Sequence, residues 1–326
     1  MVVTGIPPKE LDLNVKTHRA KQALVAALAG ERREGRTVGF VPTMGALHEG
    51  HLSLLQRARA GNDVVVASIF VNPLQFGPSD DFARYPRDLE ADAALAAEAG
   101  VDHLFAPDVA EMYPRGSIAT RVDVGPIGDI GEGAWRPGFF AGVATVCCKL
   151  FHIVGPDRAY FGQKDAQQLA VIRQLVADLD LPLEIVGCPT VREHDGLALS
   201  SRNAYLDPEA RRAAPALPAA LMAARDAAAG GEASAAELRW IVETCLEAEP
   251  GIHLQYVDLF DPATFSVLER LDARGVLAAA AHVGGTRLID NVELVSATLQ
   301  PELAAEFATE VGAGMDQAAR MKRGAA

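Results

Sequence analysis

The chain has 326 residues, of which 49% are hydrophobic and 22% charged, and this length suffices for two domains with cores of their own. Its formal net charge of -13 argues against general nucleic-acid binding, because a phosphate backbone requires a basic surface. The N-terminal residues lack a basic stretch followed by an apolar core, and no apolar run is long enough to span a bilayer. We therefore expect a soluble, cytoplasmic protein with neither nucleic acid nor membrane as partner.

The first two-thirds of the chain alternates short apolar runs with helical patterns. We predict strands at 37–43, 63–71, 103–107, 158–162 and 183–190, and helices at 51–61, 88–100, 141–155 and 167–179. Strand alternating with helix predicts a parallel sheet with right-handed crossovers. Ligands of such sheets bind beyond the carboxyl ends of the strands.

The composition changes after residue 203. An alanine-rich helical segment begins at Asp207-Pro208 and is interrupted at Gly230-Gly231, and strands are predicted at 252–260 and within 274–294. The fold class is thus α/β, with a parallel sheet domain at 1–190 and a smaller α+β C-terminal domain at 191–326. The tail after residue 299 is expected to be helical.

The four cysteines do not suggest a metal or redox site. Cys147, Cys148, Cys188 and Cys245 include no C-x-x-C pair, and each has apolar neighbours in the sequence. We predict four buried free thiols, as in a reducing compartment.

The stretch "VPTMGALHEGHLSL" contains two histidines, His48 and His51. Their spacing differs from the H-E-x-x-H of zinc proteases, and no third ligand lies nearby, which argues against zinc. They follow a T-M-G turn between a predicted strand and a helix, where free backbone N–H groups and the helix dipole favour an anion. We predict that both contact phosphate; histidines that only cap or pack are the alternative.

Other polar groups follow the ends of predicted strands. Lys164 lies in "YFGQKDAQQL", and the Ser-Ser-Arg run at 200–202 lies in a loop after the last strand. Both suit a phosphate, although a solvated lysine and a polar linker are the ordinary alternatives. Asn72 and Gln75 could orient a small polar substrate, or could serve only as turn residues. Their common place at strand ends of one sheet favours a single site.

Several of these motifs occur together in a known family. "VPTMGALHEGHLSL", "SIFVNPLQFG", "YFGQKDAQQL", "ALSSRN" and "GTRLIDN" stand in the order found in the pantoate–β-alanine ligase family, which the chain resembles over about 38–206 and 256–291. The resemblance implies the fold of the class I aminoacyl-tRNA synthetase and nucleotidylyl-transferase superfamily, usually as a homodimer. In this fold the domain at 1–190 is of the Rossmann type and the domain at 191–326 is a lid. The resemblance also implies that ATP and Mg²⁺ are used to join pantoate to β-alanine through a pantoyl adenylate, with release of pyrophosphate and AMP.

The resemblance assigns roles residue by residue. It implies catalytic roles for His48, His51, Lys164, Ser200, Ser201 and Arg202. Further ATP contacts are implied for Pro42, Thr43, Met44, Gly45, Gly50, Gly162, Asp165, Val191 and Leu199. Pantoate contacts are implied for Asn72, Gln75 and Gln168, and Asp92 is the nearest acidic match for the metal. Leu199 replaces the methionine that is commoner in the family, a change of similar volume.

Two other functions remain to be separated from this one. A nucleotidylyl-transferase that joins AMP to a phosphate acceptor shares the H-x-G-H pattern and would yield a dinucleotide. A nucleotide-binding module without catalysis would need fewer polar groups. A tRNA synthetase is disfavoured, because the chain is acidic and lacks a basic RNA-binding region.

Overall fold

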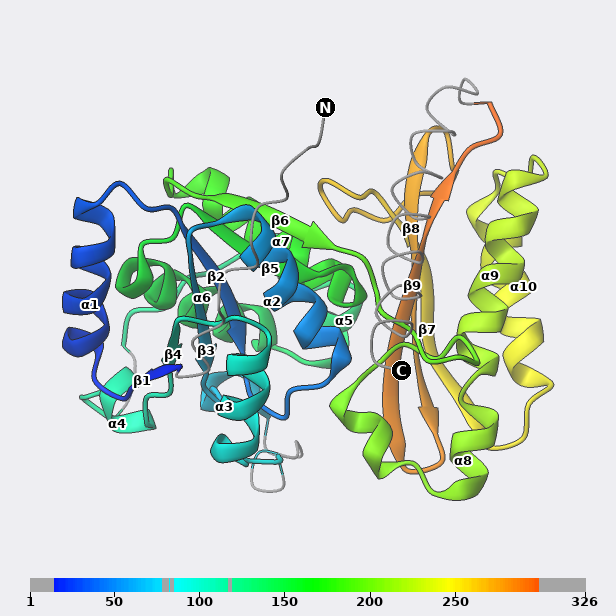
Figure 1. Ribbon diagram of the computed structural model, residues 1–326. Helices are drawn as coiled ribbons and strands as arrows, with labels where there is room; N and C mark the ends of the chain where they lie inside the picture. The colour runs from blue at the N-terminus through cyan, green and yellow to red at the C-terminus, as the bar shows by residue number, and fades with distance from the viewer. Residues whose placement is uncertain (1–14, 78–81, 83–84, 117–118, 299–326) are drawn as a thin grey trace, which may run out of the picture.

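The structure is a computed structural model that describes residues 15–77, 82, 85–116 and 119–298. It consists of an N-terminal unit built on a parallel sheet and a C-terminal unit built on a smaller antiparallel sheet (Figure 1). The helix expected after residue 299 lies outside the described residues. Within the described part of the chain, no helix is long and apolar enough to cross a membrane.

The N-terminal unit contains a six-stranded sheet in the order β1-β4-β3-β2-β5-β6, with every neighbouring pair parallel. The strands are β1 (Lys16–His18), β2 (Val38–Thr43), β3 (Val64–Ile69), β4 (His103–Phe105), β5 (Arg158–Gly162) and β6 (Glu184–Cys188). The chain builds outward from β2 through β3 to β4, and then crosses to β5 on the other side of β2. The carboxyl ends of β2 and β5 therefore flank the point where the strand order reverses, which is where such sheets bind ligands.

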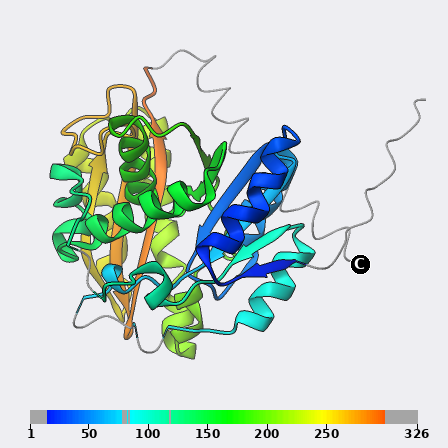
Figure 2. The ribbon, with the colours of Figure 1, turned by 90° about the vertical axis from the view of Figure 1, so that its left-hand side faces the viewer.

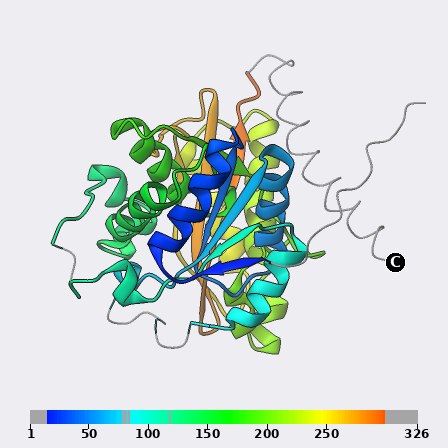
Figure 3. The ribbon, with the colours of Figure 1, turned by 60° about the vertical axis from the view of Figure 1, so that its left-hand side comes forward.

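Helices cover both faces of this sheet (Figure 3). Val64 and Val66 of β3 pack in the apolar cluster of α1 (Lys21–Arg33), α6 (Phe139–Val154) and α7 (Ala166–Asp178). Val65 and Ala67 pack in a second cluster, with α2 (Glu49–Gly61) and α3 (Leu89–Glu98). Successive side chains of a strand point to opposite faces, so a continuous apolar run such as β3 requires cover on both sides.

The C-terminal unit is a three-stranded antiparallel sheet with helices on one face. Its strands are β7 (Ile252–Phe260), β8 (Arg274–Val283) and β9 (Thr286–Val295), in that order across the sheet. Gly284 and Gly285 connect β8 to β9, and the positive φ of 57° at Gly284 suits a tight hairpin turn. A separate apolar core joins the sheet to α9 (Ala216–Ala229) and α10 (Ala235–Glu247), which lie on the side away from the N-terminal unit (Figure 1). Figure 2 shows β9, in orange, beside the green segments of the N-terminal unit.

Short helical turns complete the description. They are α4 (Val109–Met112), α5 (Glu132–Trp135), α8 (Pro208–Ala213) and the 3-10 turns η1 (Pro73–Gln75), η2 (Gly125–Gly128), η3 (Gln163–Asp165) and η4 (Ser201–Tyr205). The predicted fold class is confirmed, and the strands and helices expected between residues 37 and 190 are present with shifts of a few residues at their ends. No element was expected before residue 37, where β1 and α1 lie.

The prediction of four buried thiols is wrong for two of them. All four cysteines are free, and Cys147 and Cys188 are buried, but Cys148 is half-buried and Cys245 is exposed. Cys245 lies on α10, whose buried residues Leu238, Val242 and Leu246 form the face toward the sheet. Apolar neighbours in a helical sequence do not place a residue on the buried face, because only every third or fourth position lies there.

Candidate functional site

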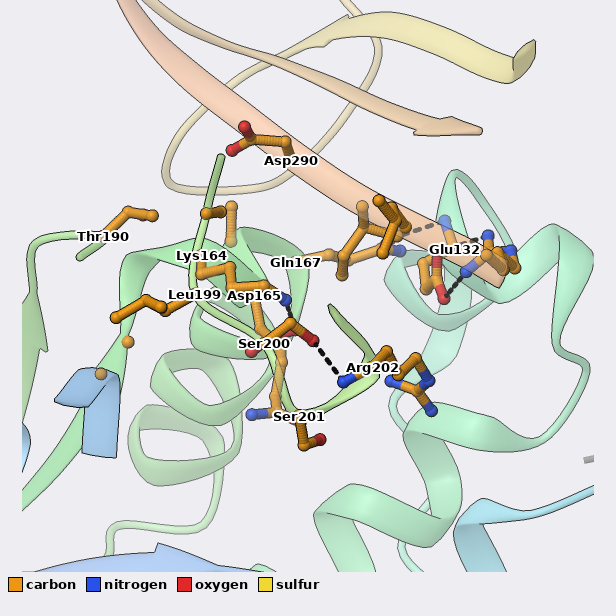
Figure 4. A pocket seen from close by; sticks show the side chains of 18 of the residues that line it. Glu132, Lys164, Asp165, Gln167, Thr190, Leu199, Ser200, Ser201, Arg202 and Asp290 are labelled. Carbon is orange, nitrogen blue, oxygen red and sulfur yellow. Dashed lines mark hydrogen bonds and ion pairs between the residues drawn. The ribbon is translucent and has the colours of Figure 1, made fainter. Parts of the chain in front are cut away.

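A cavity of about 1060 Å³ lies between the two units, and its lining includes residues at the carboxyl ends of β2 and β5, the loop after β6, and β9. Figure 4 shows Lys164, Leu199, Ser200 and Arg202 grouped in this cavity, with Asp290 of β9 above them. Most of the predicted residues line it: Pro42, Thr43, Met44, His48, Gly50, His51, Gln75, Gly162, Lys164, Asp165, Gln168, Val191, Leu199, Ser200, Ser201 and Arg202. Gly45, Asn72 and Asp92 are not among its lining residues.

The loop after β2 has a conformation that few residues tolerate. Gly45 has a φ of 87° and Ala46 a φ of 51°, both in the left-handed region. The Thr43 hydroxyl accepts from the N–H of Gly45 at 3.2 Å and donates to the carbonyl of Ser68 at 2.7 Å. A side chain at Gly45 would also approach Asp92, since a Cβ there would lie 2.8 Å from Asp92 Oδ2. Glycine is therefore required at position 45, both for its φ and for the space beside Asp92.

Asp92 holds this loop in place and does not face the cavity. Its side chain is buried, and its two oxygens accept from the N–H groups of Ala46 at 3.0 Å and Leu47 at 2.7 Å. Among the described residues, no group of three or more His, Cys, Asp or Glu side chains is arranged to hold a metal. The role of Asp92 as a metal ligand stays a prediction, and these contacts do not support it. Sequence position alone could not tell a carboxylate that serves the backbone from one that faces a ligand.

His48 and His51 form a reciprocal cap at the start of α2. His48 Nδ1 accepts from the N–H of Gly50 at 3.2 Å, and His51 Nδ1 accepts from the N–H of His48 at 3.4 Å. Because each Nδ1 is an acceptor, the proton of each neutral ring lies on Nε2, and that N–H is available to a ligand. Capping was the alternative to phosphate contact, but the two are compatible, since both rings also line the cavity.

Both rings are neutral in the absence of ligand. Burial, followed by the charge of Lys164, lowers the pKa of His48 from 6.5 to about 4. Burial, then His48 and Lys164, lower the pKa of His51 from 6.5 to about 3. The ring centroids are 4.1 Å apart, so a proton on one ring opposes a proton on the other. At neutral pH the pair offers two hydrogen-bond donors without repelling the ammonium group of Lys164.

Lys164 occupies η3, directly after β5. Its Nζ lies 3.7 Å from Asp165 Oδ1, and its side chain is half-buried. The amide of Asn291 on β9 donates to the carbonyls of Gln163 at 3.0 Å and Lys164 at 2.9 Å. The backbone of the lysine segment is thus tied to the C-terminal unit, while its ammonium group lines the cavity.

The loop at 200–202 lies close to the start of α2, which carries the two histidines. The Ser200 hydroxyl caps η4 by accepting from the N–H of Arg202 at 3.3 Å (Figure 4). The side chain of Leu199 reaches the start of α2, where a Cβ on Gly50 would lie 3.8 Å from Leu199 Cβ. A Cβ on Gly50 would also lie 2.9 Å from His48 Cε1, so glycine leaves room for the imidazole.

The turn at η1 is built around Asn72, which is buried. Its amide donates to the carbonyl of Gly142 at 3.1 Å, and its Oδ1 accepts from the hydroxyl of Tyr113 at 2.7 Å. These bonds hold the turn that places Gln75 in the cavity, and a Cβ on Gly142 would collide with the carbonyl of Leu74. The contacts give Asn72 a supporting role; the direct pantoate contact expected for it is not supported by them.

An ion pair that was not predicted from the sequence crosses the cavity. Arg287 on β9 holds both carboxylate oxygens of Glu132 on α5, at 2.6 and 2.8 Å, and Glu132 is buried. Gln167 accepts from the N–H of Glu132 at 2.9 Å and so fixes the same helix. Arg287, Asp290 and Asn291 belong to the "GTRLIDN" motif, whose polar residues within a strand were the available signal.

The fold and cavity define a class of protein: a Rossmann-type domain whose switch point carries a capped helix start, a lysine and a hydroxyl-bearing loop, an arrangement suited to a polyphosphate. The family model described as pantoate-beta-alanine ligase matches residues 16–293. The pantothenate synthetase of Moorella thermoacetica is 57% identical over 267 residues, covering 82% of this chain and 94% of its own. The pantothenate synthetase of Geobacillus kaustophilus is 54% identical over 270 residues, covering 83% and 90%.

Solved structures agree with this assignment. The crystal structure of pantothenate synthetase from Thermus thermophilus has a TM-score of 0.81 at 54% identity, covering 85% of this chain and 99% of its own. The pantoate-beta-alanine ligase from Francisella tularensis, complexed with beta-gamma ATP and beta-alanine, has a TM-score of 0.70 at 35% identity, covering 86% and 97%. The chain belongs to the pantoate–β-alanine ligase family.

Proposed function

We propose that the protein joins pantoate to β-alanine at the expense of ATP, through a pantoyl adenylate, and releases pyrophosphate and AMP. The observation that carries the proposal is the convergence of three phosphate-suited segments on one cavity: the His48–His51 helix start, Lys164 and the loop at 200–202. Curated relatives more than 50% identical to the chain are pantothenate synthetases, and the chain spans more than nine-tenths of the Moorella protein.

In the first step, a carboxylate oxygen of pantoate forms a bond to the α-phosphorus of ATP while the bond to pyrophosphate breaks. The substrate is its own nucleophile, so the protein has to align it and stabilise charge on the phosphates. The Nε2–H donors of the two histidines, the ammonium group of Lys164 and the side chains of Ser200–Arg202 supply this stabilisation. Charge-assisted bonds of this kind are worth most in a cavity that excludes water.

In the second step, the amine nitrogen of β-alanine attacks the acyl carbon of the adenylate, and AMP leaves. Gln75 and Gln168 are among the amide side chains that line the cavity, and they would orient pantoate through its hydroxyl groups. Neither step requires a covalent enzyme intermediate, which agrees with the raised pKa values of the two buried cysteines, Cys147 and Cys188.

Mg²⁺, a homodimer and a cytoplasmic location belong to this proposal as well; the first two come from the family resemblance, and the location is the expectation from the sequence. The groups suited to phosphate in the cavity are imidazole, ammonium, guanidinium and hydroxyl groups, and no group of three or more His, Cys, Asp or Glu side chains among the described residues could hold a metal. This set fits an ion carried mainly by the phosphates and water, as Mg²⁺ often is, where it would neutralise triphosphate charge. A sedimentation experiment tests the dimer.

The test is pyrophosphate exchange. Purified protein, ATP, Mg²⁺ and labelled pyrophosphate should exchange label into ATP only when pantoate is present, and AMP and pantothenate should accumulate only after β-alanine is added. Protein that binds ATP but shows no pantoate-dependent exchange would contradict the proposal. A dinucleotide product, detected by mass spectrometry with a phosphate acceptor, would favour a nucleotidylyl-transferase instead.

A further inference from the structure

The loop at 200–202 is carried by a small hairpin, residues 191–199. Arg192 and Ala198 form a bridge, the N–H of Glu193 donates to the carbonyl of Leu197 at 2.7 Å, and the N–H of Leu199 donates to the carbonyl of Val191 at 2.9 Å. Ser200 follows the second arm of this hairpin directly. The position of the hairpin therefore decides where the Ser-Ser-Arg side chains lie.

Arg192 fastens the hairpin to β9. Its guanidinium group donates to both carboxylate oxygens of Asp290, at 2.6 and 2.9 Å, and to the carbonyls of Gly196 at 3.0 Å and Asn291 at 3.2 Å. Only 3% of Asp290 is exposed, so the carboxylate has little access to water. Its partners are Arg192 and the N–H of Asn291, which donates to Oδ1 at 2.8 Å. A bidentate pair fixes both the distance and the orientation of the groups it joins.

The same point of β9 also holds the lysine segment. Asn291, the residue after Asp290, donates to the carbonyls of Gln163 and Lys164 on the face toward the N-terminal unit. Asp290 thus fixes the loop at 200–202 through Arg192, and the adjacent Asn291 fixes the lysine segment directly. A strand is stiff along its length, so the two phosphate-suited segments keep a constant separation.

Two further ion pairs on the hairpin, both made by Arg211, provide a matched control. Arg211 of α8 contacts Glu193 and Asp195, each at 2.7 Å, but all three side chains are more exposed than Asp290, and none of their bonds reaches β9. Solvent reaches these half-buried pairs and weakens them; fully exposed pairs contribute typically about 0.2–1 kcal/mol. Loss of Arg211 removes an arginine from the same hairpin without releasing it from β9.

We infer that Asp290 and Arg192 are positioning residues for adenylate formation, because together they hold the Ser200–Arg202 loop at a fixed position relative to Lys164. The inference rests on the proposed function. The pyrophosphate part of ATP is present only in the first step, so a shift of the loop relative to Lys164 lowers the rate of pyrophosphate exchange. It leaves the reaction of an adenylate already formed with β-alanine nearly unchanged.

The experiment measures the two steps separately. Asp290→Asn and Arg211→Gln are first compared with the parent protein for pantoate-dependent exchange. In the second assay, enzyme-bound adenylate is accumulated with pyrophosphatase present. The rate of pantothenate formation is then measured after β-alanine is added. A displacement of the loop by about 1 Å is expected to lower the kcat of exchange roughly 100-fold in Asp290→Asn. The rate with preformed adenylate stays within about twofold of the parent, and Arg211→Gln matches the parent in both assays.

Normal exchange in a folded Asp290→Asn protein overturns the inference. A parallel fall of both rates also overturns it, because that result indicates general damage to the cavity. If Asp290→Asn does not fold, the double variant Arg192→Gln with Asp290→Asn replaces it, since it leaves no unpaired buried charge. Failure of the proposed function is recognised separately, by the absence of pantoate-dependent exchange in the parent protein.

Discussion

The two cap histidines predict how stability depends on pH. Their pKa values in the folded protein, about 4 for His48 and about 3 for His51, lie below the 6.5 of the unfolded chain. Between these values the unfolded state binds more protons than the folded state, so the free energy of unfolding falls as the pH falls below 6.5. The effect is largely complete once the pH reaches the folded-state values. Lys164 strengthens the effect and Asp165 opposes it for His48.

The magnitude follows from the linkage relation. At pH 5 an unfolded histidine is almost fully protonated while each of these two rings is largely neutral, which costs about 2 kcal/mol per ring. Both rings are partly accessible from the cavity, and solvent screening reduces the cost. We expect the pair to lower the free energy of unfolding by about 2–4 kcal/mol between pH 7 and pH 5 in the absence of ligand.

The assay is urea unfolding of the ligand-free protein, followed by circular dichroism at several pH values. The variant His48→Asn with His51→Gln keeps acceptors at the helix cap but cannot titrate. Its unfolding free energy should fall by about 2–4 kcal/mol less than that of the parent over this range. His253→Gln, at an exposed position of β7, serves as control and should behave as the parent does. An unchanged pH dependence in the double variant would refute the reasoning.

Three further predictions concern single side chains. Lys164→Ala should lower the kcat of pyrophosphate exchange about 100- to 1,000-fold, because a charge beside the phosphates is lost; near-normal exchange would remove Lys164 from the mechanism. Asp92→Asn should lower the free energy of unfolding by about 1–3 kcal/mol, because a buried acceptor of two backbone N–H groups is weakened. The Mg²⁺ dependence of exchange should stay unchanged; an altered dependence would support Asp92 as a metal ligand. In the native protein a thiol reagent should modify Cys245 rapidly. Cys147 and Cys188 should react only on unfolding, because they are buried and their pKa values are raised to about 12 and about 11. Rapid modification of Cys147 would contradict the described packing.

The sheet and the phosphate-suited segments could be predicted from sequence because their signals are local. A continuous apolar run such as β3 indicates a strand covered on both faces, and a histidine at a strand-to-helix turn is visible within a short stretch of sequence. The Glu132–Arg287 pair joins residues 155 positions apart, and no pattern near either residue names its partner. The contacts of Asp92 could not be predicted for the same reason, since its partners are backbone N–H groups of Ala46 and Leu47 in a distant loop.

The contacts of the hairpin 191–199 also bear on the division of the chain. The boundary between residues 190 and 191 remains a prediction, which these contacts support, because Arg192 and Glu193 bind Asp290 and Arg211 of the C-terminal unit. A protein cut at this point would carry Lys164 on one fragment and Ser200–Arg202 on the other. Neither fragment alone would hold a complete set of phosphate contacts. Recovery of activity on mixing the fragments would therefore measure how well the two units associate, which makes catalysis itself a reporter of interdomain binding.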